Sequence, residues 1–280
     1  MTGRAAVTAI LSCVVVLAAG AAQPRPERII SLVPAATEIL FAVGAGPRVV
    51  AVSSYDREPA AVAGLPRVGA LVDPNLERIL SLRPDLVVIY GTQHELRTQL
   101  DRAGVAYTPF THGGLRDVMA AIRALGARTG DGPQAEIVAS GMERDLAGIA
   151  ERVQGRPRPR TLLVFGREPG TLRNMYASGG RGFLHDMLVA AGGDNVLAGQ
   201  PRESVQVTTE MLLTLKPEVV LELHATGAAM DLSAWQALPS IPAVRDGRVV
   251  VLEGSDLVVP GPRVAAATGR FARALHPGAF

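Results

Sequence analysis

The sequence predicts an α/β protein of two Rossmann-like lobes with mostly parallel sheets, joined by one long connecting helix. Two observations predict this fold. Short apolar runs alternate with amphipathic helical segments along the chain, and this alternation is typical of parallel sheets covered by helices. In addition, one pattern of a helix, a proline and an apolar run occurs twice, at 75–89 and 208–222. The repeat indicates that the two halves have similar structures.

The two copies of the pattern agree in register when Glu77 is aligned with Glu210. Leucines then stand at helical spacing in both copies and are followed by the strings RPD (83–85) and KPE (216–218). Proline cannot continue a helix and disfavours helix in the residue before it. A short apolar run follows in each copy. Each copy is therefore predicted to be a helix that leads into a buried strand.

The first lobe is predicted to span residues 23–132. Gly44 and Gly46 end its first helix. Its strands are expected at 28–32, 48–52, 86–89 and 105–110, and its helices at 34–43, in the first repeat copy, at 94–103 and at 116–129. In parallel sheets, ligands meet the loops at the carboxyl ends of the strands. These loops are 33–36, 53–56 and 91–93 in this lobe.

Residues 133–154 are predicted to form the linking helix. Apolar residues including Ile137, Met142 and Ile149 recur on one face, and a helix of about 22 residues is about 33 Å long. That length suits a connection between lobes. The second lobe, 155–280, is expected to contain strands at 161–165, 219–221 and 248–252, a glycine-rich loop at 166–180, and helices at 182–191, in the second repeat copy and from about residue 262.

Residues 1–22 have the features of a secretory signal peptide. Arg4 supplies the positive charge, residues 5–18 form the apolar region, and small residues precede Gln23. We therefore expect export to the periplasm or another extracytoplasmic compartment. Cys13, the only cysteine, lies inside the apolar region rather than after it, which disfavours a lipid anchor there. The mature chain would then have no disulfide and no thiolate metal site.

The composition narrows the classes of function. The chain has 280 residues, of which 48% are hydrophobic, enough for two modest cores. A net charge of +2 with no basic run argues against a nucleic-acid partner. Motifs of hydrolases, zinc proteases and phosphate-binding loops are absent from the sequence, and the five histidines are scattered. No catalytic or metal-binding residue is predicted, although a secreted Rossmann-like enzyme stays open as an alternative.

Glu77 and Glu210 are the strongest candidates for a functional pair. A carboxylate in the first turn of a helix is ordinarily stabilised by the helix dipole, by about 0.3–1 kcal/mol. That effect explains each residue alone, but it does not explain their shared register. Two equivalent carboxylates on two lobes would suit a twofold-symmetric basic partner, because arginine binds carboxylates through paired, charge-assisted hydrogen bonds.

Four strings of the sequence resemble a known family. They are SLVPAATEI (31–39), DPNLERILSLRPDLVV (73–88), YASGG (176–180) and AGGDNV (191–196). With the export signal and the duplicated lobes, they resemble the periplasmic substrate-binding proteins of ABC importers for cobalamin, ferric siderophores and haem. The resemblance implies a rigid monomer without a resident cofactor, which binds a small-molecule ligand between its lobes. It also implies that Glu77 and Glu210 pair with arginines of the two permease subunits.

The resemblance is closest to the cobalamin-binding branch and implies a corrinoid ligand. Tyr55, in the SSY string after the second strand, and Tyr176 stand where that branch has aromatic ligand contacts, and Asp256 matches an aspartate after the last strand. Leu71 and Ser204 stand in the places of two tryptophans of the best-known cobalamin binder. Tyr55, Leu71, Tyr176 and Asp256 are therefore the predicted ligand contacts.

Haem and ferric siderophores are the other ligands bound by this family. Haem-binding members often have a ligating tyrosine where this chain has Ala70, which disfavours haem. Siderophore binders often line the cleft with arginines and tryptophans, and Arg167, Arg173 and Arg181 would suit an anionic iron chelate. A ferric siderophore therefore stays open as the alternative ligand.

Overall fold

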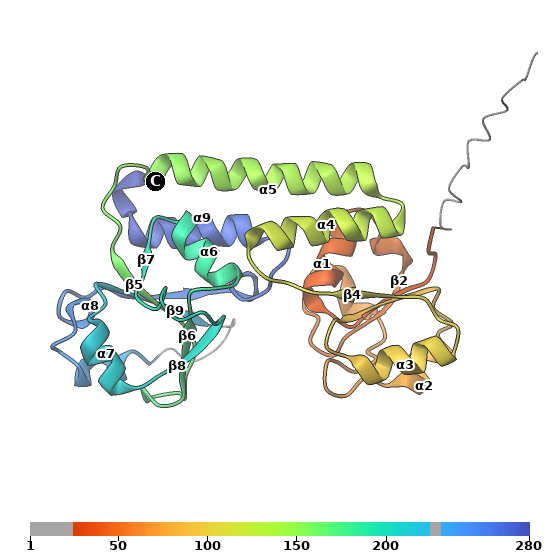
Figure 1. Cartoon of the computed structure of the whole chain (residues 1–280), viewed down its shortest axis with the longest axis horizontal. Helices are drawn as coiled ribbons and strands as arrows, with labels where there is room; N and C mark the ends of the chain where they lie inside the picture. Colours follow the sequence, from red (N-terminus) through yellow and green to blue (C-terminus); the bar gives the residue numbers. More distant parts are fainter. Residues whose placement is uncertain (1–24, 225–230) are drawn as a thin grey trace, which may run out of the picture.

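The computed structural model describes residues 25–224 and 231–280 and contains two separate sheets. The signal peptide predicted at 1–22, with Cys13, lies outside the described residues. The sheets lie side by side, and long helices run along one side of the pair (Figure 1). The two sheets match the predicted pair of α/β lobes.

The N-terminal sheet has four parallel strands in the order β2-β1-β3-β4. Its strands are β1 (Ile29–Ser31), β2 (Val49–Val52), β3 (Leu86–Tyr90) and β4 (Tyr107–Phe110). The helices α1 (Pro34–Ala42), α2 (Leu76–Ser81), α3 (His94–Arg102) and α4 (Leu115–Thr129) alternate with these strands, with 3-10 turns at Gly46–Arg48 and Ala60–Gly64. The central strands β1 and β3 are almost wholly buried, as expected for apolar runs covered on both faces.

The C-terminal sheet is mixed, with the strand order β10-β9-β5-β6-β8 and a short β7 paired to β5. Its strands are β5 (Arg160–Gly166), β6 (Met175–Ser178), β7 (Asp194–Asn195), β8 (Ser204–Val207), β9 (Val219–His224) and β10 (Val249–Glu253). Its helices are α6 (Phe183–Ala190), α7 (Thr209–Leu215), α8 (Pro242–Arg245) and α9 (Val264–Leu275), with 3-10 turns at Ser233–Ala237, Ser255–Leu257 and Pro277–Ala279. β6 runs antiparallel to both β5 and β8.

The antiparallel strand β6, which pairs with β5 and β8, differs from the sequence prediction, which placed a loop over 166–180. β6 is only four residues long and alternates one exposed residue, Tyr176, with buried Met175 and Ala177. Glycines follow it closely in the sequence. So short an alternating pattern cannot be told from a turn by periodicity alone.

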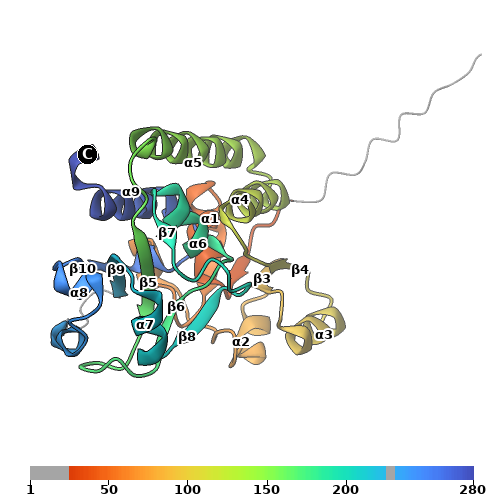
Figure 2. The same cartoon turned by 60° about the vertical axis from the view of Figure 1, so that its left-hand side comes forward.

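The connecting helix α5 (Gly132–Val153) runs along both α4 and α9, so it spans the two lobes (Figures 1 and 2). Its buried face differs in part from the prediction, because Ile137 is 63% exposed while Ala135 and Ala139 are buried. Small residues face inward because α4 lies close. A Cβ added to Gly126 of α4 would stand 2.2 Å from the Cβ of Ala135.

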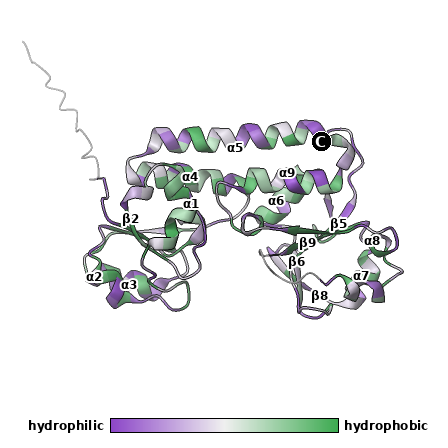
Figure 3. Cartoon of the chain, turned by 180° about the vertical axis from the view of Figure 1, so that it is seen from behind, coloured by the Kyte–Doolittle hydropathy of each residue, from purple (hydrophilic) through white to green (hydrophobic). Residues whose placement is uncertain are grey.

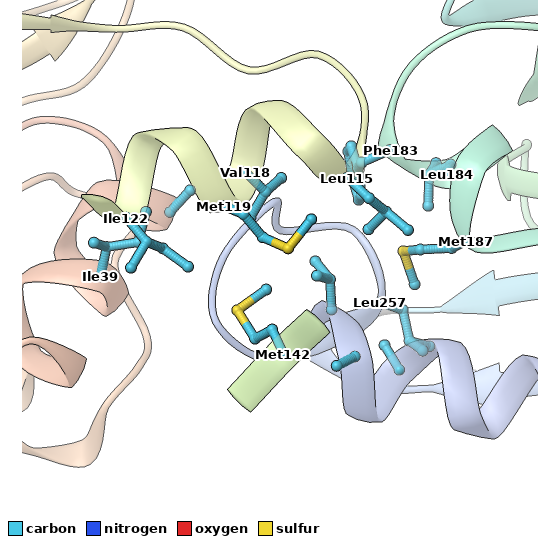
Figure 4. Packing of buried hydrophobic residues seen from close by; sticks show 14 of the residues in the cluster. Ile39, Leu115, Val118, Met119, Ile122, Met142, Phe183, Leu184, Met187 and Leu257 are labelled. Atoms are coloured by element: carbon cyan, nitrogen blue, oxygen red, sulfur yellow. The ribbon is translucent and has the colours of Figure 1, made fainter. Parts of the chain in front are cut away.

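One hydrophobic core continues from one lobe into the other. Figure 4 shows side chains of α1, α4, α5 and α6 meeting at the junction together with Leu257. Met119 and Met142 lie among them, and both are at most 8% exposed. Separating the lobes here would expose apolar surface to water, which costs about 25 cal/mol of free energy per Å². In Figure 3, hydrophobic and hydrophilic residues alternate along α5, as expected for a helix with one face in this core and the other in water.

Two polar contacts also join the lobes at this junction. The Arg263 guanidinium donates to both carboxylate oxygens of Glu38, at 2.8 and 2.6 Å. Glu38 belongs to α1 of the first lobe, and Arg263 precedes α9 of the second. Elsewhere, the backbone N–H of Leu115 donates to Asp186 Oδ2 at 2.9 Å, which joins the start of α4 to α6. The described junction therefore restricts relative movement of the two lobes.

Candidate functional site

Large apolar side chains are exposed near the ends of strands in both lobes. Tyr55 follows β2 and is 67% exposed, and Leu71 and Val72 precede α2. In the second lobe Tyr176 lies on β6, and Val258 follows the turn after β10. The carboxyl ends of the strands are also where α/β sheets bind ligands.

The loop that carries Tyr55 is held by buried polar groups. Asp56 is 1% exposed and accepts hydrogen bonds from the backbone N–H of Ser53, at 2.9 Å, and from its hydroxyl. Arg67 donates to the carbonyl oxygens of Ser53 and Asp56, both at 3.0 Å. Burial raises the pKa of Asp56, an effect opposed by the Ser53 and Thr37 hydrogen bonds. Tyr55 therefore projects from a loop of fixed shape.

Leu71 is 42% exposed and is positioned by a glutamine that sequence reasoning assigned to a ligand loop. Gln93 is buried, and its Nε2 donates to the carbonyl oxygens of Ala70 and Leu71 at 3.2 and 3.0 Å. Its Oε1 accepts from the backbone N–H of Tyr90 at 2.9 Å. Gln93 thus links the end of β3 to the segment before α2.

The second lobe has a hollow of about 250 Å³ next to its exposed apolar residues. Phe165, Phe183 and Val258 line it together with Arg181 and Ser204. By the resemblance described above, Ser204 stands where a cobalamin binder has a tryptophan. The small side chain of Ser204 leaves part of this hollow open. Tyr176 lies on the neighbouring strand, where it pairs with Gln206.

Asp256 does not present a free carboxylate. Both of its oxygens accept from Arg270 Nη1 at 3.1 Å, and Arg270 also donates to the carbonyl oxygen of Glu253. The Asp256 side chain is 17% exposed. Its ion pair ties the turn after β10 to α9, so any ligand contact from Asp256 would share the carboxylate with Arg270.

Arg167 and Arg173, two of the three arginines considered for an anionic ligand, are also engaged. Arg167 is buried and pairs with Glu222 at 2.6 Å. Glu222, itself 1% exposed, also accepts from Trp235 Nε1 at 2.8 Å. Arg173 pairs with Glu168 at 3.2 Å on the surface. Within 25–224 and 231–280, only Arg181 of the three has no ion pair.

Glu77 and Glu210 occupy equivalent places, both exposed in the first turns of α2 and α7. Each helix is capped alike. Asn75 Oδ1 accepts from the backbone N–H of Arg78 at 2.9 Å, and Thr208 Oγ1 accepts from that of Met211 at 3.3 Å. Both helices lie on the side of the molecule away from α5 (Figures 1 and 3).

The repeated construction continues beyond the two helices. Arg83 and Lys216, aligned in the sequence repeat, both have left-handed backbone conformations, with φ of 46° and 45°. The next acidic residue in each copy accepts a backbone hydrogen bond at the start of the neighbouring strand. Asp85 accepts from the N–H of Arg28, and Glu218 accepts from the N–H of Arg160, both at 2.9 Å. Both glutamates are therefore set on their sheets in the same way.

Two arginines complete this construction, and sequence reasoning missed them. Arg28 donates to the carbonyl oxygen of Leu82 at 2.7 Å, and Arg160 donates to that of Leu215 at 2.9 Å. Each arginine stands at the start of its lobe's first strand and binds the end of α2 or α7. The only sequence signal is that an arginine opens both strands.

The described part of the chain offers no sign of a metal centre or a membrane span. No group of three or more histidine, aspartate or glutamate side chains is placed to hold a metal ion there. None of its helices is long and apolar enough to cross a bilayer.

Comparison with known proteins assigns a family. A family model described as periplasmic binding protein matches residues 29–255. The vitamin B12-binding protein of Yersinia pseudotuberculosis is 28% identical over 246 residues, 86% of this chain and 84% of that protein. An uncharacterized ABC transporter substrate-binding lipoprotein of Bacillus subtilis is 27% identical, over 92% of this chain and 82% of that protein. The apo periplasmic haem-binding protein of Roseiflexus sp. RS-1 is 27% identical, with a TM-score of 0.75 over 91% of this chain and 99% of that chain.

These matches confirm the family and the fold class predicted from the sequence. The matched range, 29–255, includes every strand of both sheets. Members of this class bind ligands for transport rather than resident cofactors, and they are not enzymes. The alternative of a secreted Rossmann-like enzyme is therefore set aside. The chain belongs to the periplasmic binding protein family.

Proposed function

We propose that this protein binds a corrinoid, a cobalamin-like ligand, between its lobes and delivers it to an inner-membrane ABC permease. The main support is a set of exposed apolar side chains near strand ends in both lobes: Tyr55, Leu71, Tyr176 and Val258 are each at least 42% exposed. Aromatic and aliphatic side chains suit the faces and edges of a large planar ring. The vitamin B12-binding relative supports the same ligand.

The arginines support a corrinoid over an anionic iron chelate. Arg167 is buried against Glu222, and Arg173 pairs with Glu168. Of these three arginines, only Arg181 could bind an anionic siderophore without giving up an ion pair, and breaking the buried pair of Arg167 and Glu222 would be costly. Asp256, paired with Arg270, adds a contact to a polar edge of the ligand.

Haem is a second candidate because a haem-binding protein is among the structural neighbours. Ala70 takes the place of a tyrosine that often ligates haem iron, yet the exposed phenol of Tyr55 could supply an oxygen ligand instead. Calorimetric titration with cyanocobalamin, hemin and ferric chelates distinguishes the candidates. The one tryptophan, Trp235, is buried against Glu222, so its fluorescence is a poor reporter of the cleft.

A corrinoid carrier should bind cyanocobalamin with a Kd well below about 10 μM, a binding free energy of about −7 kcal/mol or better. Tyr55→Ala and Tyr176→Ala should each weaken binding about tenfold, since an aromatic contact contributes about 0.5–1.5 kcal/mol beyond the area it buries. Tyr107→Ala on β4 is the control. Tight binding of hemin or a ferric chelate without cyanocobalamin binding would overturn the assignment.

Docking to the permease is proposed to occur through Glu77 and Glu210. Both carboxylates are exposed, and both are set on the sheets by the same hydrogen bonds. Arginines of the two permease subunits would bind them through charge-assisted hydrogen bonds. We also propose that the protein acts as a monomer, exported by residues 1–22 and not anchored through Cys13.

A further inference from the structure

The surface beside Glu210 contains a hollow that the docking proposal does not explain. Its volume is about 390 Å³, and it lies between α7 and the segment 196–200. Its apolar lining residues are Val196, Leu197, Met211 and Leu215, and Glu210 also lines it. A charged carboxylate and an apolar recess therefore share one small surface.

The corresponding surface of the N-terminal lobe has different chemistry. In the sequence repeat, Met211 aligns with Arg78, which is exposed next to Glu77 on α2. Thr214 aligns with Ser81, so the polar residue one turn further along each helix is retained. The two lobes thus present equivalent glutamates, but an arginine replaces the apolar rim in the first lobe.

Glu210 remains ionised at the edge of this recess. Hydrogen bonds from the Thr208 side chain and from the backbone lower the pKa of Glu210 below its usual range. An occupant must therefore supply a cation for Glu210 and, next to it, a group that gains by leaving water. A free anion or a wholly apolar peptide satisfies only one of these requirements.

We propose that the hollow receives an apolar side chain of the permease segment whose arginine binds Glu210. The C-terminal lobe then makes a mixed ionic and apolar contact, whereas the N-terminal lobe makes an ionic contact through Glu77. This inference rests on the proposed docking function and adds the partner's chemistry to it. A few side chains that fill well-packed, desolvated pockets supply most of the affinity of protein interfaces, whereas charged pairs exposed at the rim supply little.

Filling the hollow tests the proposal. Gly199 lies in its lining, a Cβ there would meet no atom within 4 Å, and its backbone is not left-handed. Gly199→Trp should therefore fold normally and block the recess. Gly132→Trp is the matched control, because Gly132 has equally open surroundings at the start of α5, on the far side of the molecule.

The readout is binding to the permease that the wild-type protein engages, reconstituted in lipid nanodiscs, at low and high salt. Gly199→Trp should weaken binding about tenfold or more at both salt concentrations, because an apolar contact is not screened. Cyanocobalamin affinity should stay within about twofold of the wild type. Thr214→Trp, which fills the same recess from α7, should behave alike.

Two results separate the possible failures. If Gly199→Trp and Thr214→Trp bind the permease as tightly as Gly132→Trp does, while Glu77→Lys/Glu210→Lys does not bind, the apolar contact is wrong and the ionic docking stands. If Glu77→Lys/Glu210→Lys also binds normally, the docking function itself is wrong.

Discussion

Arg28 and Arg160 make an equivalent bond in the two lobes, whereas the strand-end loops of those lobes have little in common. Each arginine binds the carbonyl end of the helix that carries an exposed glutamate. At the strand ends, by contrast, the first lobe has a loop fixed by Asp56 and Arg67, and the second has the antiparallel strand β6 between β5 and β8. The lobes have stayed alike in one region and diverged in another.

The difference is informative because a duplicated chain is free to diverge wherever its two halves have different tasks. Two similar permease subunits would require two similar docking surfaces. A single ligand without symmetry has two unlike faces, so the loops around it need not match. The construction that both lobes share beneath Glu77 and Glu210 therefore fits docking better than ligand binding.

Reversing both docking charges should have the largest effect. Glu77→Lys/Glu210→Lys places cations opposite the proposed permease arginines, so uptake of labelled cyanocobalamin by cells should stop. Ligand affinity of the purified variant should stay within a few-fold of the wild type. Glu95→Lys/Glu151→Lys has the same charge change at exposed helix positions elsewhere and is the control. Unimpaired import by Glu77→Lys/Glu210→Lys would contradict docking through these residues. The likeness of the two lobes would then have no functional explanation.

The buried ion pair at the end of β9 tests the divergent region. Glu222 aligns with Ile89 of the first lobe, so one lobe buries a paired carboxylate where the other buries an aliphatic side chain. Arg167→Ala would remove the guanidinium that pairs with buried Glu222 and leave only Trp235 and His224 as its partners. The change should lower the free energy of unfolding by about 3–5 kcal/mol. Chemical denaturation measures this change. Arg173→Ala, in a surface pair, should cost less than about 1 kcal/mol, and equal losses would contradict a structural role for Arg167.

Substitutions at Arg83 and Lys216, the left-handed residues of the repeat, should change the free energy of unfolding equally, and by less than Arg167→Ala does. An ordinary residue in this conformation is strained by about 1–2 kcal/mol, and glycine removes the strain but costs about 0.5–1 kcal/mol in chain entropy. Arg83→Gly and Lys216→Gly should each raise the free energy of unfolding by about 0.5–1 kcal/mol. Ala150→Gly in α5 should lower it by a similar amount. A gain in one lobe only would show that the repeat is not equivalent at this position.

Much of the repeated region could be predicted from the sequence, because its signals are local. Proline after a leucine-rich helix specifies where α2 and α7 end, and the shared register then singles out Glu77 and Glu210. The divergent region depends on contacts between distant segments. Arg167 and Glu222 are 55 residues apart, and nothing in either neighbourhood indicates their pairing. Gln93 is predicted to lie in a ligand loop, but its bonds to Ala70 and Leu71, 23 and 22 residues away, are not indicated by the sequence.

The smallest expected effect concerns His276, after α9 in the second lobe. Burial, helped by nearby Arg156, Arg248 and Arg158, lowers the pKa of His276, and a hydrogen bond to the Gly192 carbonyl opposes this only in part. The folded protein therefore favours the neutral ring, while the unfolded chain takes up a proton below about pH 6.5. Stability from this histidine is present above that pH and is lost as the pH falls.

The pH dependence of unfolding measures this effect. His276→Gln cannot titrate, so its free energy of unfolding should fall less than that of the wild type between about pH 7.5 and pH 5.5. His94→Gln, at the exposed start of α3, is the control for loss of a histidine. If His276→Gln and the wild type lose stability in parallel, His276 is not buried as a neutral ring. The contact of the second lobe's end with Gly192 would then have to be revised.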